Sequence, residues 1–165
     1  LGNAHPNISP YEVVPASDGH VILAVGNDGQ FRKLCDILKL EGMADDERFA
    51  TNRARVANRD EVRRRVTAAT AAIAKAELLA ACERDGVPAG PINSIAETFD
   101  DPQVKARGLR VDLPDADGNV IPGVRTPIVF SGTPLVYDRP SPRLGEHTEA
   151  VMAELGILET GKKSA

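Results

Sequence analysis

The sequence predicts an α+β fold in which a small antiparallel sheet with packed helices is followed by further strands and a C-terminal helix. Three observations support this prediction. Two strand-like runs near the start flank a turn at residues 17–19. Three amphipathic helical patterns follow before residue 86. After residue 108 the composition shifts toward proline and strand-forming residues, so we divide the chain there.

The first two predicted strands form a hairpin. Residues 11–15 and 20–25 carry aromatic and β-branched side chains, and Gly19 in the turn between them tolerates a positive φ. In the second run one face carries Val21 and Leu23, and the other carries Ile22. Because both faces are apolar, we expect this strand to be covered on both sides.

The first predicted helix follows the sequence Gly-Asn-Asp-Gly at residues 26–29. Asn27 or Asp28 there can accept a hydrogen bond from the free backbone N–H groups of the helix start. Apolar residues then recur at spacings of three and four, and Gly42 is the expected end. The apolar face consists of Phe31, Leu34, Cys35 and Leu38.

Two longer helices are predicted over about residues 58–74 and 75–84, and Gly86 is the expected stop of the second. Three consecutive arginines at 63–65 resemble a phosphate patch. Successive helical residues lie about 100° apart, so these side chains fan around the helix and we interpret them as a solvated face. The stretch 86–92 contains two prolines, which lack backbone donors, and we therefore exclude a central strand there.

Two short helices are predicted next. Residues 94–97 match a capping box, and Asp101 followed by Pro102 is typical of a second helix start. Gly108 is the expected end of that second helix.

The remainder of the chain is predicted to form a hairpin, an extended tether and a helix. Residues 109–113 and 120–131 alternate like strands around a turn at 115–119. Three prolines between residues 134 and 142 indicate an extended tether. We expect a final short helix to begin near Glu146 or Thr148 and to end at Gly156.

Composition narrows the functional classes. The chain has 24 acidic and 20 basic residues, a net charge of -4, and four Phe, two Tyr and no Trp. A nucleic-acid binder should show a basic stripe or aromatic stacking platforms, so we expect no nucleic acid. No apolar run approaches the roughly 18 residues of a membrane span, so we expect no membrane association. We interpret Cys35 and Cys82, which lie in helical patterns, as reduced core thiols of a cytoplasmic protein.

The residues alone leave the function open. Histidines and cysteines lie too far apart in sequence for a metal site, and no phosphate-binding loop or nucleophile elbow occurs. His5, between Asn3 and Asn7 in a polar loop, is either an acid–base or orienting group or a local hydrogen-bonding group. His147 lies at a predicted helix start, where the free amides either bind an anion or are capped by Thr148.

Six segments in the same order together resemble the class III CoA-transferase family, also called CaiB/BaiF. The resemblance covers about residues 2–157, and the order of the segments makes it specific. The segments are residues 2–11, residues 18–31, residues 45–49 with Asn52, residues 86–93, residues 101–108, and residues 144–148 with Val151 and Leu155-Gly156.

The resemblance implies an architecture for a longer protein. Family members have a large Rossmann-like domain and a small domain, and two ring-like chains interlock as a homodimer. Residues 1–108 correspond to the small domain. Residues 109–165 correspond to return strands, a Pro-rich tether and a C-terminal helix that lead back to the missing Rossmann-like domain. The chain begins with Leu1 in a loop-like stretch, so we expect it to be the C-terminal portion of such a protein.

The resemblance also implies a reaction: transfer of CoA between acyl-CoA thioesters and carboxylic acids through an aspartyl intermediate. The nucleophilic aspartate belongs to the N-terminal domain, so we expect no catalytic residue and no activity in this chain alone. No metal and no cofactor besides the CoA thioester substrate are implied. The alternatives are an α-substituted acyl-CoA racemase or epimerase of the same fold, and a non-catalytic interaction module.

The substrate-binding residues implied by the resemblance lie in two segments. Gly2, Asn3 and His5 correspond to a loop that approaches the active site in the transferases. Asn27 and Asp28 lie about where the racemases carry a supporting acidic residue.

Overall fold

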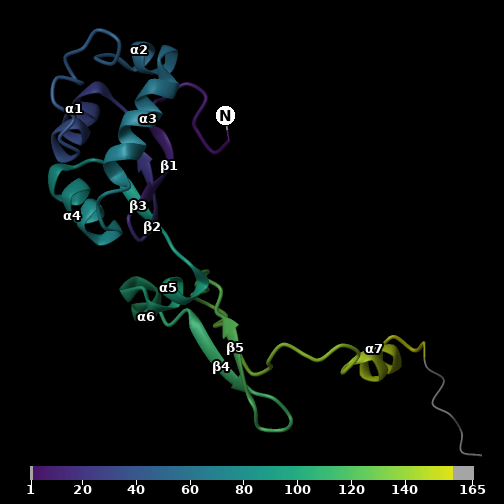
Figure 1. Ribbon diagram of the computed structural model, residues 1–165. Helices are drawn as coiled ribbons and strands as arrows, with labels where there is room; N and C mark the ends of the chain where they lie inside the picture. The colour runs from purple at the N-terminus through teal and green to yellow at the C-terminus, as the bar shows by residue number, and fades with distance from the viewer. Residues whose placement is uncertain (1, 158–165) are drawn as a thin grey trace, which may run out of the picture. The chain divides into compact units, whose positions relative to one another are not determined.

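The computed structural model describes residues 2–157 and divides the chain into two compact units, Leu1–Ser94 and Ile95–Ala165 (Figure 1). The α+β prediction is confirmed, because both units combine short helices with antiparallel strands. The expected boundary at residue 108 refers to the end of the family's small domain, and it stays a prediction. The return of residues 109–165 to a Rossmann-like domain also stays a prediction.

The first unit is built on a three-stranded antiparallel sheet. Its strands are β1 (Tyr11–Ala16), β2 (Gly19–Ala24) and β3 (Ala89–Ile92), in the order β1-β2-β3. The β1–β2 hairpin is confirmed, with Tyr11 opposite Ala24 and Ala16 opposite Gly19. Residues 89–92 form an edge strand that pairs with β2 alone, so Pro91, which lacks a backbone donor, does not interrupt a second ladder.

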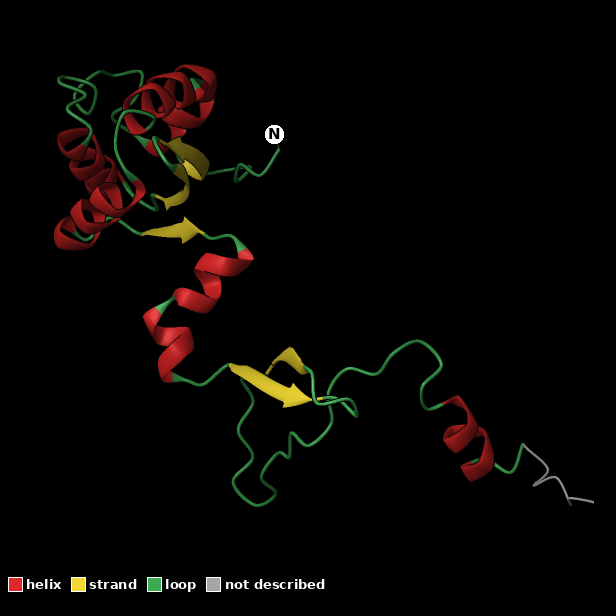
Figure 2. Ribbon diagram, turned by 60° about the horizontal axis from the view of Figure 1, so that its bottom comes forward, coloured by secondary structure: helices red, strands yellow, loops and turns green. Residues whose placement is uncertain are grey.

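Four helices complete the first unit. They are α1 (Asp28–Ile37), α2 (Asn52–Ala57), α3 (Arg59–Thr70) and α4 (Lys75–Asp85). Helix α3 packs on β1, α4 packs on β2 and β3, and α1 packs on α4, as Figures 1 and 2 show. The core joins strand residues such as Val21 and Leu23 to helix residues such as Phe31, Val62 and Leu78, all of them at most 1% exposed.

The prediction that β2 is covered on both faces is wrong for the described residues. Val21 and Leu23 are fully buried, whereas Ile22 on the opposite face is 37% exposed. Ile92 on β3, which pairs with His20 on that same face, is 43% exposed. The physical reason is that the core helices pack on the face that carries Val21 and Leu23. The sheet therefore has one face in the core and one half-open apolar face.

Helix boundaries differ from the predictions in three places. Helix α1 ends at Ile37, before Gly42, because the chain turns at Lys39, which has a φ of 54°. Helix α2 was not predicted, and α3 ends at Thr70 rather than near residue 74. Helix α4 ends as predicted, with Gly86 in the left-handed conformation at a φ of 70°.

The second unit contains α5 (Ile95–Asp100), α6 (Pro102–Ala106), β4 (Arg110–Pro114), β5 (Val120–Val124) and α7 (Thr148–Glu154). The β4–β5 hairpin is confirmed, but its second strand ends at Val124 rather than at residue 131. The Asp101 side chain caps α6 by accepting from the backbone N–H groups of Gln103 and Val104, as predicted. No described residue of 95–157 is buried, whereas residues 2–94 contain the whole apolar core.

Candidate substrate site

The two predicted substrate-binding segments lie at the same end of the β1–β2 hairpin. In an antiparallel pair, the residues before the first strand and after the second strand are neighbours, and Tyr11 pairs with Ala24 here. The Val25 N–H donates to the Pro10 carbonyl over 3.2 Å, which extends the contact beyond the strands. Residues 2–10, here called the N-terminal loop, therefore run beside the connection that leads into α1.

The N-terminal loop is ordered by contacts to β1. The Asn3 Oδ1 atom accepts from the Val13 N–H over 3.0 Å, and the His5 N–H donates to the Tyr11 carbonyl over 2.9 Å. Gly2 has a φ of 59°, a conformation that favours glycine. Gly2 and Asn3 are exposed, and they line a hollow of about 380 Å³ with Glu12, Val13, Arg63 and Thr67.

His5 forms a local hydrogen bond. Its Nδ1 atom accepts from the Asn7 N–H over 3.1 Å, and its ring lies 5.3 Å from the ring of Tyr11. A neutral imidazole that accepts at Nδ1 carries its proton on Nε2. His5 is thus oriented by the loop itself and presents a donor at Nε2, while its role toward a substrate stays a prediction.

The side chains of Asn27 and Asp28 make different interactions at the start of α1. Asn27 is the helix cap, and its Oδ1 accepts from the Gln30 N–H over 2.9 Å. Asp28 is exposed, and its Oδ1 accepts from the Arg55 Nη2 over 2.8 Å. The negative charge of Asp28 in the first turn also interacts favourably with the helix dipole.

Three polar side chains from α2 and α3 hold the N-terminal loop by its backbone. Asn52 Nδ2 donates to the Asn7 carbonyl over 2.9 Å, and Asn52 Oδ1 accepts from the Ser9 N–H over 3.2 Å. Arg59 donates to the carbonyls of His5 and Pro6, each over 2.7 Å. Arg55, the third member, donates to the Ser9 carbonyl over 2.7 Å. We call Asn52, Arg55 and Arg59 the loop clamp.

Arg55 also contacts the second predicted segment. Its guanidinium is fully buried and donates to the Phe49 carbonyl over 2.9 Å, besides Ser9 and Asp28. The guanidinium carbon lies 4.3 Å from the centroid of the Phe31 ring, which gives a cation–π contact. One side chain therefore connects the N-terminal loop, α1 and α2.

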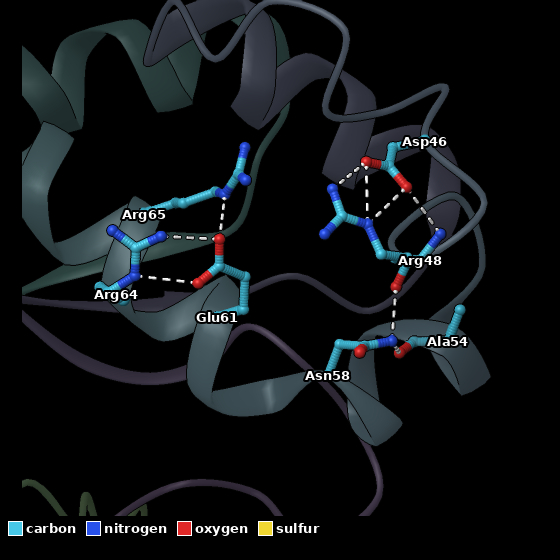
Figure 3. Close-up of polar contacts among 7 residues, drawn as sticks. All are labelled: Asp46, Arg48, Ala54, Asn58, Glu61, Arg64 and Arg65. Atoms are coloured by element: carbon cyan, nitrogen blue, oxygen red, sulfur yellow. Dashed lines mark hydrogen bonds and ion pairs between the residues drawn. The ribbon is translucent and has the colours of Figure 1, made fainter.

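The outer side of the α2–α3 corner is fixed by a second polar group (Figure 3). Asn58 Nδ2 donates to the carbonyls of Arg48 and Ala54 over 3.1 and 3.0 Å. Arg48 pairs with Asp46 and lowers the pKa of that carboxyl to about 2. Hydrogen bonds from Arg65 and then Arg64 lower the pKa of Glu61 in the same way.

The arginines at 63–65 fan around α3, as the helical spacing predicts. Arg63 points to the sheet and pairs with the buried Glu12 over 2.6 Å, whereas Arg64 and Arg65 both pair with Glu61. Each of the three is in an ion pair with a carboxylate, so the interpretation as a plain solvated face is incomplete.

The prediction that both cysteines are core thiols is confirmed. Cys35 and Cys82 are free and buried. Within residues 2–157, no group of three or more potential ligands could hold a metal ion. No described helix is long and apolar enough to cross a membrane.

Sequence reasoning missed the loop clamp. Asn52 and Arg55 are three residues apart on one side of α2, a pattern that could have been recognised, whereas Arg59 belongs to the next helix, α3. The sequence gives no sign of their partners, because the backbone carbonyls of the N-terminal loop lie 45 to 54 residues away.

Comparison with known proteins gives a family and several relatives. The family model described as CoA-transferase family III matches residues 1–148. Succinate–glutarate CoA-transferase of Agrobacterium fabrum is 67% identical over 159 residues, which are 96% of this chain and 40% of that protein. Mouse succinyl-CoA:glutarate CoA-transferase is 34% identical over 162 residues, which are 97% of this chain and 37% of that protein.

A solved structure has a similar fold. The crystal structure of a CaiB/BaiF family protein from Brucella suis superposes with a TM-score of 0.79 at 51% identity, over 94% of this chain and 40% of that chain. The chain thus spans about two fifths of the length of the relatives that it matches.

Proposed function

Because the chain belongs to CoA-transferase family III, we propose that the protein containing it transfers coenzyme A from an acyl-CoA thioester to a free carboxylic acid. The observation that supports this most directly is the 67% identity to a succinate–glutarate CoA-transferase over 96% of the chain. The donor and acceptor that we propose are accordingly dicarboxylic acids of four and five carbon atoms, such as succinate and glutarate.

The proposed reaction uses an aspartate outside this chain. Its carboxylate attacks the thioester carbonyl of the donor, releases CoA thiolate and forms a mixed anhydride. The thiolate then attacks the aspartyl carbonyl and releases the donor acid, which leaves an aspartyl-CoA thioester. The acceptor carboxylate displaces CoA to form a second anhydride, and the thiolate attacks the acceptor carbonyl to complete the exchange. Covalent catalysis of this kind divides one difficult exchange into easier steps.

The residues of this chain bind and orient the substrate in the proposed reaction. The exposed positions Gly2 and Asn3, and His5 with its Nε2 donor, form one wall of the acyl pocket. Asn27 and Asp28 form the adjoining wall at the amino end of α1. We further propose that the full-length protein is a cytoplasmic, interlocked homodimer that needs no cofactor besides its CoA thioester substrate.

The experiment uses the full-length protein with succinyl-CoA and glutarate, and mass spectrometry of the products. We expect glutaryl-CoA and succinate to form in equal amounts. If the glutarate carries ¹⁸O in its carboxylates, a turnover through the aspartyl intermediate leaves one ¹⁸O atom in the enzyme carboxylate. In a later turnover this atom leaves with the donor acid, so labelled succinate is released. The chain of residues 1–165 alone is the control, and we expect it to be inactive.

Two other results would replace the proposal. Deuterium uptake at the α carbon of an acyl-CoA in D2O, without movement of CoA between acids, would identify a racemase or epimerase. If the full-length protein catalysed neither deuterium exchange nor CoA transfer, a non-catalytic interaction module would be favoured. No observation on the described residues favours either alternative.

A further inference from the structure

We propose that Arg55 is a positioning residue of the transferase site, which holds the N-terminal loop and the amino end of α1 together as one substrate-facing surface. The inference rests on the proposed function, because it concerns the same site. It is independent of the identity of the acid, since Arg55 itself is fully buried.

All three nitrogen atoms of the Arg55 guanidinium group donate hydrogen bonds. Its Nε donates to the Ser9 carbonyl over 2.7 Å, Nη1 to the Phe49 carbonyl over 2.9 Å, and Nη2 to the Asp28 Oδ1 over 2.8 Å. These acceptors lie 46, 6 and 27 residues away in the sequence. A planar group with fixed donor directions therefore sets the relative positions of three chain segments.

The burial of this charge indicates a role beyond packing. Transfer of a guanidinium from water to the interior is costly, and an apolar side chain of similar volume often gives equal or greater stability at such a position. The Asp28 side chain that neutralises Arg55 is 54% exposed, so the pair reaches from the core to the surface at the predicted substrate segment. The buried arginine thus fixes an exposed carboxylate at the amino end of α1.

All contacts of the loop clamp to the N-terminal loop use main-chain atoms. The carbonyls of His5, Pro6, Asn7 and Ser9 and the N–H of Ser9 are held by Asn52, Arg55 and Arg59. The buried Ser9 hydroxyl has no hydrogen-bond partner among the described residues, although the backbone of Ser9 is bonded on both sides. The clamp therefore determines the path of residues 5–9 through their backbone, while the side chains of Asn3 and His5 are oriented by their own hydrogen bonds to the N–H groups of Val13 and Asn7.

The test compares Arg55→Lys with Arg53→Lys in the full-length protein. Lysine keeps the charge but cannot reproduce the three fixed donor directions. Arg53 is an exposed residue of the same helix and serves as the matched control. We expect R55K to raise the KM for the acyl-CoA about tenfold or more, which corresponds to about 1.4 kcal/mol of lost binding, while R53K leaves it unchanged.

A change in KM distinguishes a positioning role of Arg55 from a purely structural role. A variant that only loses folded protein has fewer active molecules, so its apparent kcat falls and its KM does not change. Asp28→Asn, which keeps the two carbonyl contacts of Arg55, is the second variant, and we expect a smaller rise in KM. An unchanged KM in both variants would overturn the proposal.

Hydrogen exchange provides a readout that does not depend on activity. In R55K we expect faster exchange in residues 3–9 and at the start of α1 together, and unchanged exchange in the control R53K. If the unmodified full-length protein transfers no CoA, the proposed function fails and this measurement decides the inference alone. Unchanged exchange in both segments would then disprove it. If R55K does not fold, the Asp28→Asn variant is measured in its place.

Discussion

Cys35 and Cys82 illustrate what a periodic pattern predicts about single residues. Cys35 shares the helix face of Phe31 and Leu34, and it is 3% exposed in the structure. Burial raises the pKa of the Cys35 thiol from 9.0 to about 11 and also raises the pKa of Cys82. The folded chain therefore disfavours both thiolates.

We expect both thiols to react slowly with iodoacetamide at pH 8 unless the chain is unfolded. A pKa that is about two units higher reduces the thiolate fraction of Cys35 roughly 100-fold. The contribution of this raised pKa to the free energy of unfolding is fully present below the unfolded pKa near 9 and is lost as the pH rises through about 11. Mass spectrometry with and without guanidinium chloride measures the labelling, and rapid labelling of Cys35 in native buffer at pH 8 would contradict the prediction.

Arg55 shows where residue-level prediction fails. Arginine is seldom fully buried, so a sequence reader assigns it to the surface by default. Its burial depends on acceptors that meet only after the hairpin and α2 have assembled. By contrast, the Asn27 cap of α1 was predictable because cap and helix are adjacent in sequence.

Among the secondary-structure elements, those marked by local signals were predicted well. The hairpin turn at Gly19, the Asp101-Pro102 helix start and the Gly86 stop all depend on nearby residues. The end of α1 was mispredicted because the turn at Lys39 uses a non-glycine residue with positive φ, for which the sequence has no signal. The open face of β2 was also mispredicted, since alternation shows that a face is apolar and not what covers it.

Gly86→Ala tests the stop signal of α4. Gly86 has a φ of 70°, and an added Cβ would meet only Lys33 Nζ at 3.9 Å, so the cost is conformational rather than steric. We expect the free energy of unfolding to fall by about 1 kcal/mol. Urea unfolding measures it, with Gly132→Ala as the control because nothing lies within 4 Å of a Cβ there. Equal midpoints for the two variants would show that Gly86 is not required.

At the scale of the whole molecule, the apolar core belongs to the first unit, and most of the large exposed apolar side chains belong to the second. The core lies in residues 2–94, while exposed apolar side chains continue through the described part of the second unit. Val120 and Val124 of the β4–β5 hairpin are 64% and 70% exposed. The family was predicted from six segments spread over the chain, whereas no single segment would have sufficed.

We expect residues 1–165 produced alone to self-associate at micromolar concentrations. Exposed apolar patches and open sheet edges favour association between copies. Sedimentation velocity over a concentration series measures the effect, and Val120→Lys combined with Val124→Lys should reduce it. A species that remains monomeric at every concentration would refute this expectation.

The main-chain anchoring of residues 5–9 has an evolutionary consequence. A loop whose backbone is held in this way tolerates exchange of those side chains that do not themselves order it. Asn3 and His5 accept from the N–H groups of Val13 and Asn7, so substitutions at positions 3 and 5 that keep an acceptor there preserve the scaffold while acid preference diverges among descendants. A combinatorial library of acceptor-bearing side chains at these two positions is a practical starting point for altering selectivity.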